Sequence, residues 1–347
     1  MFKARYLCLF VSLYCLLSES AAAHVKWFTE PLDSTEGGLN FHYSVNSKEV
    51  LIGVAILIVV VSVSIFLDKK LPSVKPLERK WQSYINFLFN VLVGISLFCA
   101  SYSGHVIAPH YKVFNDFTMF LQIMQAVIAV CFILNIYVVF ASVLLIALFM
   151  GTLISFDFIE LLDYINVLGV SLFVFLNNFN TKPYRRIFLP YATPLLRVFT
   201  GVGLVVLAFS EKLLNPELAV QFLEKNPWNF MQMLGFDYSD YLFVLSAGFV
   251  ELAIGIVFIL GTVVRINTLV IVSVMITTNI VFVVYGNYKD GLTEIIGHLP
   301  IIATAIVLLT QGAGRRLVIY PYNGFDIAGY VSKMVRIASR RPLVASD

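Results

Sequence analysis

Ionisable side chains inside apolar stretches are the first residues of this sequence that could do chemistry. Glu251 lies near the middle of one apolar segment, and Glu294 and His298 lie four residues apart in another. An ionised group within a membrane is costly and functional by default, and residues four apart share one face of a helix. Arg197 near the start of a further apolar segment is the fourth candidate. These four residues are the candidate catalytic residues, and they predict a proton path or cofactor pocket in which a water or a substrate bridges His298 and Glu251. The alternatives are that Glu251 is paired with a residue of a neighbouring helix and that Arg197 extends to the membrane surface.

The histidines could form a second kind of site, for a metal ion. Imidazole is a common ligand of copper and zinc. Cleavage of the chain after Ala23 would make His24 the N-terminal residue, whose α-amine and ring nitrogen could bind one metal, as in the histidine brace of exported copper proteins. The candidate ligands on the predicted outer side of the membrane are His24, His42, His105 and His110. The alternative is that His24 is merely tolerated after the cleavage site.

Three acids, Asp157, Glu160 and Asp163, recur every three residues at the predicted outer end of a helix. Acids at a helix N-terminus are stabilised by the helix dipole, which favours a solvated helix end. The alternative is that they join the outer histidines as metal ligands.

A basic and aromatic cluster, Lys26, Trp27 and Phe28, follows the predicted cleavage site. Such residues near a membrane are typical of anchoring to lipid headgroups. The alternative is that they cap the outer mouth of the helix bundle.

The elements that must position these residues are membrane helices. Apolar residues make up 59% of the 347-residue chain and charged ones only 13%, whereas a soluble domain is about half apolar and a quarter charged. The predicted fold is an all-α polytopic membrane protein, and the net charge of +3 gives no indication of nucleic-acid binding. The nine predicted spans are 49–67, 85–105, 116–134, 136–154, 158–177, 194–210, 241–263, 266–285 and 293–311.

The N-terminus has the pattern of a secretory signal. A basic start precedes a short apolar run over 6–17, and Ala21-x-Ala23 fits the small-residue cleavage rule. This pattern predicts that residues 1–23 are a cleaved signal peptide and that 24–48 face outward. The alternative is an uncleaved first helix.

Basic residues gather in three segments on one predicted side, 68–84, 178–193 and the tail 313–347. By the positive-inside rule this side is cytoplasmic. The sequence therefore predicts a bacterial inner-membrane protein, surrounded by the lipid bilayer, with its N-terminus outside and its C-terminus inside.

An internal repeat relates the two halves of the chain. Residues 90–109 align without gaps on 197–216, and 121–134 align on the segment near 246–260. Further alignment pairs Gln125 with Glu251, Glu160 with Glu294 and Tyr164 with His298. Both units begin on the same side, which predicts a parallel repeat. The predicted architecture is a leading helix (49–67) followed by two four-helix units, 85–177 and 190–312.

The second unit has a recognisable set of polar and small residues. The set comprises Arg197-x-x-x-Gly201, Lys212 with Pro216, Glu251-x-x-x-Gly255, Gly261 near Arg265, and Gly297-His298-Leu299-Pro300. With it, residues 190–312 resemble the DoxX family of small four-helix membrane proteins. The resemblance implies a membrane-embedded bundle, which in some members is tied to quinone-linked oxidation of sulfur compounds or to redox-protective complexes. The first unit is similar to a divergent copy of it.

Three functional hypotheses follow, and they leave open whether the protein is an enzyme. The first is a redox-associated subunit with a quinone or substrate pocket around Glu251 and His298. The second is an outward-facing copper-handling protein that uses His24. The third is a transporter or a non-enzymatic scaffold with a pathway between the two units. The first two hypotheses imply other membrane or periplasmic redox or metal-handling proteins as partners.

Overall fold

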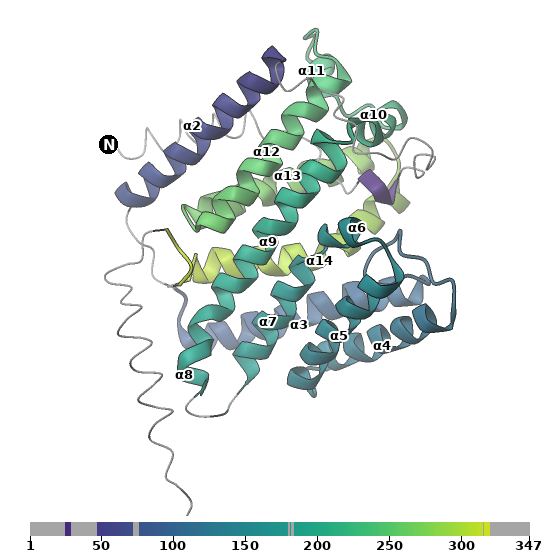
Figure 1. Ribbon diagram of the computed structural model, residues 1–347, viewed down its shortest axis with the longest axis vertical. Helices are drawn as coiled ribbons and strands as arrows, with labels where there is room; N and C mark the ends of the chain where they lie inside the picture. Colours follow the sequence, from purple (N-terminus) through teal and green to yellow (C-terminus); the bar gives the residue numbers. More distant parts are fainter. Residues whose placement is uncertain are drawn as a thin grey trace, which may run out of the picture.

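The computed structural model describes residues 25–28, 47–71, 76–179, 181, 184–314 and 316–319, which form helices joined by turns (Figure 1). Eight of the described helices are long and apolar enough to cross a membrane. Seven of them are α2 (Lys48–Lys70), α3 (Arg79–Tyr102), α4 (Asp116–Ile133), α5 (Val138–Ser155), α12 (Asp240–Leu260), α13 (Val264–Val284) and α14 (Tyr288–Gln311). The prediction of a polytopic helical membrane protein is confirmed.

The remaining long span runs from Tyr184 to Leu213 and changes its winding along the way. It comprises α8 (Tyr184–Phe188), the 3₁₀ turn η2 (Leu189–Tyr191), α9 (Ala192–Ala208) and the π-helical turn η3 (Phe209–Leu213). A π turn inserts one residue into the helical repeat and therefore reorients the side chains that follow. In this span the reoriented residues include Glu211 and Lys212.

The prediction of a ninth long helix over 158–177 is not met. The segment is divided into α6 (Phe158–Leu162) and α7 (Asn166–Asn178). Backbone bonds from Asp163 N–H to the Glu160 carbonyl and from Tyr164 N–H to the Leu161 carbonyl give the connection the tighter 3₁₀ winding. The 13 residues of α7 extend about 20 Å at 1.5 Å per residue, less than the ~30 Å apolar thickness of a bilayer.

Short polar residues begin several of the helices. Ser47, Asn115 and Ser239 are the N-caps of α2, α4 and α12, and each side chain accepts a hydrogen bond from a backbone N–H of the first turn. Such caps satisfy donors that have no partner inside the helix. The N-terminal ends of these helices are therefore determined by the local sequence.

Beside α2, the main helices divide by their order along the chain into two groups of four. The first group contains α3, α4, α5 and α7, and the second contains α9, α12, α13 and α14 (Figure 1). In each group the first helix packs against the second and the third against the fourth. Between the groups, α3 contacts α14 and α9 contacts α7, so the first helix of each group meets the last helix of the other. Helix α2 packs against α12 at the edge of the second group.

Close helix contacts occur at aligned positions in the two groups. A Cβ atom on Gly94 would lie 2.9 Å from the carbonyl oxygen of Ala129, and one on Gly201 would lie 2.7 Å from that of Gly255. The sequence alignment pairs these residues with one another. Only glycine allows the backbones of α3 and α4, and of α9 and α12, to approach this closely.

The turns that follow these helices also match. The φ angles of Asn135 and Gly261 are 54° and 75°, and those of Tyr137 and Val263 are 48° and 39°. Positive φ is uncommon for residues other than glycine. Two such angles, two residues apart, therefore occur at equivalent places after α4 and after α12.

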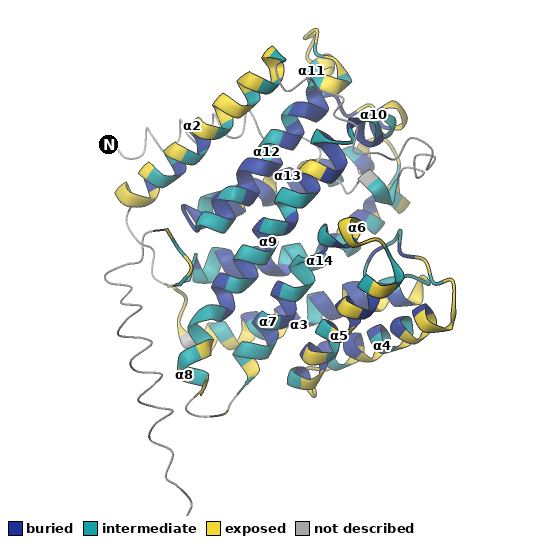
Figure 2. Cartoon of the chain, viewed as in Figure 1, coloured by how far each residue is buried: buried dark blue, intermediate teal, exposed yellow. Residues whose placement is uncertain are grey.

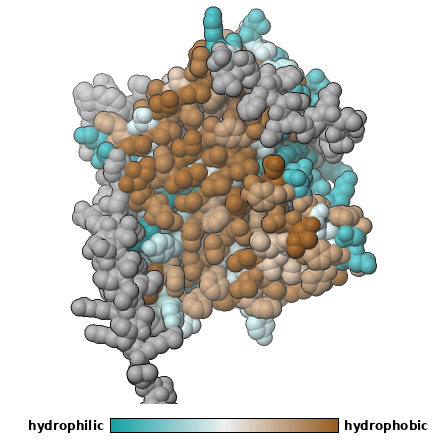
Figure 3. Space-filling model, viewed as in Figure 1, coloured by the Kyte–Doolittle hydropathy of each residue, from teal (hydrophilic) through white to brown (hydrophobic). Residues whose placement is uncertain are grey.

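The distribution of apolar side chains agrees with contact to lipid. Helix α2 is exposed along most of its length, whereas α12 is largely buried (Figure 2). In the space-filling view, apolar side chains cover most of the visible face and hydrophilic ones gather at its edges (Figure 3). Exposed apolar surface of this extent is stable only against another apolar phase.

A short segment of the N-terminal region lies against the bundle. The 3₁₀ turn η1 (Val25–Trp27) contacts α10 (Pro216–Lys225), an amphipathic helix that packs against α12 and η3. The connection continues through α11 (Phe230–Met233) before α12 begins.

Candidate ligand cavity between the two helix groups

A cavity of about 580 Å³ lies between the two helix groups. Its wall includes Ser96 and Cys99 of α3, Thr200 of α9, Glu251 of α12 and His298 of α14. The volume is within the range of pockets for small organic ligands. Two predicted site residues, Glu251 and His298, thus line one cavity.

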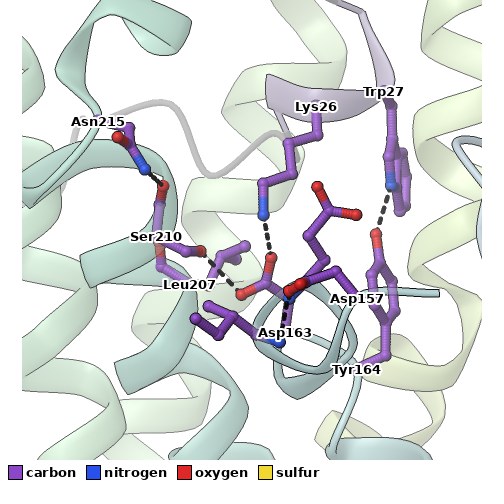
Figure 4. A network of polar contacts seen from close by, with 10 residues as sticks. Lys26, Trp27, Asp157, Asp163, Tyr164, Leu207, Ser210 and Asn215 are labelled. Atoms are coloured by element: carbon purple, nitrogen blue, oxygen red, sulfur yellow. Dashed lines mark hydrogen bonds and ion pairs between the residues drawn. The ribbon is translucent and has the colours of Figure 1, made fainter. Parts of the chain in front are cut away.

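The segment Lys26–Phe28 covers one side of the cavity, whose wall includes Trp27 and Phe28, and this side is referred to as the mouth. The Lys26 ammonium donates to Asp163 Oδ2 over 2.5 Å, and the Trp27 indole N–H donates to the Tyr164 hydroxyl over 2.7 Å (Figure 4). The headgroup-anchor interpretation of these residues is therefore wrong, since their polar atoms bind protein groups. The alternative, that they cap the mouth of the bundle, agrees with the structure.

The aromatic rings of this segment fit a site shaped for them. The Trp27 ring lies 5.3 Å from the His298 ring between centroids, and a Cβ atom on Gly297 would overlap it. The Phe28 ring lies 5.9 Å from that of Phe222 and 5.3 Å from that of Phe282. The glycine next to His298 is thus required by the indole of Trp27.

Asp163 is the buried acceptor at the mouth. Its side chain is fully buried and accepts hydrogen bonds from Lys26 and, over 2.8 Å, from the Ser210 hydroxyl (Figure 4). The sequence-based interpretation of Asp163 as a solvated helix-end acid is therefore wrong. Asp157 is exposed and caps α6, as that interpretation predicts.

Electrostatics keep the Lys26 ammonium charged. Burial lowers the pKa of this group, but the carboxylates of Glu211, Asp163 and Glu160 outweigh it, so the pKa of Lys26 is raised above its ordinary value. Opposite charges nearby favour the ionised form of a base. The mouth therefore holds a cation on a buried acid.

A second ion pair lies deeper in the bundle. The Lys212 ammonium donates to Glu251 Oε2 over 2.8 Å, and the two side chains are 3% and 8% exposed. The π turn η3 carries Lys212 toward α12. Gly248, one turn before Glu251, permits the approach, because a Cβ atom there would lie 3.2 Å from Lys212 Cβ.

Glu294 and His298 lie on one face of α14, as their spacing predicts. His298 Nδ1 lies 2.9 Å from the Glu294 carbonyl oxygen and 3.4 Å from Glu294 Oε1. Glu294 is 1% exposed, and within the described residues its Oε2 atom has no hydrogen-bond partner. Glu211 and Lys212 lie near enough to interact electrostatically with it.

These ionisable groups form what is called here the charge cluster. It consists of Lys26, Asp163, Glu211, Lys212, Glu251, Glu294 and His298. Sequence reasoning did not propose Glu211 or Lys212 as site residues. The signal that could have found them is an acid–base pair that continues an apolar helix with no turn residue before Asn215.

Among the described residues, the aligned place in the first group carries no ion pair. Gln125, the counterpart of Glu251, is fully buried and its amide donates to the carbonyl oxygens of Leu97 and His105, while its Oε1 accepts from Ile107 N–H. In the first group, the neutral amide of Gln125 therefore holds the connection between α3 and α4. The charged pair is a feature of the second group.

Arg197 lies away from the cavity, in the first half of α9. Its buried guanidinium donates to the carbonyl oxygens of Phe258, Ile259 and Leu317. It thereby satisfies the carbonyl groups at the end of α12, a common arrangement for a basic residue near a helix C-terminus. The structure therefore separates Arg197 from the other three predicted site residues.

The predicted metal ligands are only partly described. His24 and His42 lie outside the described residues. His105 lines the cavity, and burial together with Lys112 lowers its pKa, while the His110 ring packs against Tyr111 and Tyr164. In the part of the chain that the structure describes, no three histidine, cysteine, aspartate or glutamate side chains are grouped to hold a metal ion.

Comparison of the chain with protein-family models, with curated proteins and with solved structures gives no match. The class that the fold and the cavity define is an integral membrane protein of helices.

Proposed function

We propose that the chain is a membrane transport protein whose solute binds in the cavity between the two four-helix groups. The observation that carries the proposal is the place of the cavity. It lies between two groups with the same order of helix packing and is lined by ionisable residues. In transporters built from repeats the solute site lies at the repeat interface, and ionisable residues inside a membrane mark solute and proton paths.

The proposal includes the hypothesis that the two helix groups are copies of an internal repeat. The matched glycine contacts at Gly94 and Gly201, and the matched turns at Tyr137 and Val263, support two copies of one four-helix unit. A pseudo-twofold axis between such copies would place Tyr164 and His298 at equivalent positions. Both residues contact Trp27 at the cavity mouth.

The charge balance of the cluster favours coupling to protons. Four carboxyl groups face two ammonium groups and one imidazole among its members. Because an uncompensated buried charge is very costly, this excess of acid among the described members of the cluster favours a proton or a bound cation on one carboxyl group. Glu294, with one oxygen that lacks a partner among the described residues, is the residue we assign to this role.

The basic segments 68–84 and 178–193 support an orientation with the mouth at Lys26 on the outer side. The pattern of residues 1–23 supports export of the N-terminal segment across a bacterial inner membrane. Attachment of a reporter enzyme behind residue 181 and behind residue 287 would test the orientation, since opposite sides are expected.

Transport is tested with purified full-length protein in liposomes. Uptake of radiolabelled ammonium compounds, carboxylates and sugars is measured with and without an imposed proton gradient. We expect one class to enter faster than in protein-free liposomes, and Glu251→Gln and Glu294→Gln to abolish this uptake. The matched control is Lys225→Met, at an exposed position of α10. Equal uptake by the Glu251→Gln and Glu294→Gln variants and the wild type would refute the proposal.

One observation favours a redox-associated subunit as a second candidate. Cys99, Glu251 and His298 line the same cavity, whose volume also suits the headgroup of a quinone. The resemblance of residues 190–312 to the DoxX family stays a prediction that agrees with this role. If Glu251→Gln and His298→Ala leave quinone-linked activity and growth under oxidative or sulfur stress unchanged, this candidate fails.

The copper hypothesis depends on His24 and stays a prediction. It is tested by metal analysis of the purified protein with and without one residue added ahead of His24. Copper bound through the N-terminal amine would be lost on extension, whereas equal copper in both proteins would exclude it.

A further inference from the structure

The segment Lys26–Phe28 presents an ammonium group followed by two aromatic rings to the cavity mouth. We infer that this segment occupies a binding site for an organic ammonium ion, and that the solute is a small primary amine with an aromatic or similar apolar group. The inference deepens the proposed transport function and rests on it only for the fate of the bound solute.

The polar half of the site is the acceptor that Lys26 occupies. Asp163 belongs to the connection between α6 and α7, and Ser210, which donates to it, belongs to η3. The acceptor is therefore built from both helix groups. A fully buried carboxylate requires a cation on it, and an ammonium group with three donors is the simplest cation that fits the position of Lys26 Nζ.

The apolar half of the site receives a flat ring. The Trp27 indole contacts Tyr164 and His298, which come from the two different groups, and it lies over Gly297, where any larger residue would intrude. Aromatic pairs at such separations add to the gain from burial. A planar substituent on the amine would make the same contacts.

The cavity has room for the solute on the inner side of this segment. Trp27, Asp163 and His298 belong to its wall together with Glu251, so a free amine in the cavity can take the place of the Lys26 ammonium on the Asp163 carboxylate once Lys26 leaves it. The segment and the solute then compete for one acceptor. A tethered competitor acts at an effective concentration of about millimolar, which weakens but does not abolish binding of the solute.

The surrounding charge favours a cation over an anion or a neutral solute. The carboxylates of Glu211, Asp163 and Glu160 all act on the Lys26 ammonium. Like charges suppress binding of the wrong partner, so a carboxylate solute would be repelled from this mouth.

The inference is tested by calorimetric titration of the full-length protein in detergent with 2-phenylethylammonium, with 2-phenylethanol as the uncharged probe of matched shape. Removal of the competitor by Lys26→Met is expected to tighten binding of the ammonium probe by about tenfold. Lys26→Arg keeps the cation and is expected to bind as the wild type does. Asp163→Asn in the Lys26→Met background is expected to abolish binding.

Two results would overturn the inference: equal affinity of the Lys26→Met variant and the wild type for the ammonium probe, or equal binding of the alcohol. A second measurement holds even if the variants fail to fold. In the wild type, whose tryptophans are Trp27, Trp81 and Trp228, the ammonium probe should displace Trp27 and thereby change the tryptophan fluorescence of the protein, and an unchanged emission spectrum at saturating probe contradicts the inference. Binding of the ammonium probe without its uptake into liposomes would refute transport and leave the site assignment intact. Uptake of another solute class without ammonium binding would refute the site assignment and leave transport intact.

Discussion

Replacement of Lys212 by methionine tests whether a buried ion pair holds η3 against α12. The side chains of Lys212 and Glu251 are 3% and 8% exposed, and their charged atoms lie 2.8 Å apart. Methionine retains the length of the lysine side chain but removes the Lys212 ammonium from the buried Glu251 carboxylate.

The size of the effect follows from this geometry. At 2.8 Å and an effective dielectric constant of about 20, the Coulomb energy of two unit charges is about 6 kcal/mol. Because water and nearby dipoles compensate part of the loss, the free energy of unfolding should fall by about 3–5 kcal/mol, as when one partner of a buried pair is removed. The double variant Lys212→Met/Glu251→Leu removes both charges and should recover most of this loss.

The free energy of unfolding is measured by titration with sodium dodecyl sulfate in mixed micelles, with helicity as the signal. Lys225→Met, at an exposed position of α10, is the matched control and should change stability by less than about 0.5 kcal/mol. If Lys212→Met is as stable as this control, or the double variant is no more stable than Lys212→Met, the pair does not stabilise the contact between η3 and α12.

Three further predictions concern the mouth and the repeat. Gly297→Ala should displace Trp27, because the added Cβ overlaps its ring. A red shift of the protein's tryptophan emission is expected, with none in Gly203→Ala, where the nearest atom would be 3.4 Å away. Gly94→Ala and Gly201→Ala should each lower the free energy of unfolding by about 1–3 kcal/mol through overpacking. If the losses of the two variants differ by more than the width of this range, the two contacts are not equivalent. Because the pKa of Lys26 is raised from 10.5, the stability gained from its ion pair is complete below pH 10.5 and lost as pH rises through the higher folded-state pKa. The tryptophan emission of the wild type should therefore show a shift above pH 10.5 beyond that of Lys26→Met, in which only the ionisation of other groups contributes; a shift near neutral pH that Lys26→Met lacks would refute the assignment.

Much of the helical framework could be predicted because apolar length alone determines a membrane span. The predicted spans around Glu251 and His298 overlap α12 and α14, and the four-residue spacing of Glu294 and His298 places them on one face of α14. The failure at 158–177 has a tertiary cause. Apolar content suggests one helix, but Asp163 accepts hydrogen bonds from two distant residues, and the backbone winds more tightly to bring it there.

The candidate site could be predicted only in part. Glu251 and His298 were found because each is an ionisable residue in an apolar segment. Glu211 and Lys212 were missed, because a charged pair at the end of a helix is ordinarily solvated and only the π turn η3 carries it inward. Arg197 was placed in the site by its residue type, but its partners are backbone carbonyl groups far along the chain.

By itself, the sequence determined that this is a helical membrane protein, because hydropathy over about 20 residues is a local property that requires no knowledge of neighbours. It also indicated which ionisable residues are unusual. The tertiary structure alone decided which of them meet. The segment at Lys26 lies 137 residues from Asp163 in the chain, and Lys212 lies 39 residues from Glu251. Such pairs depend on how helices pack and where they change winding, and these are properties of the assembled bundle.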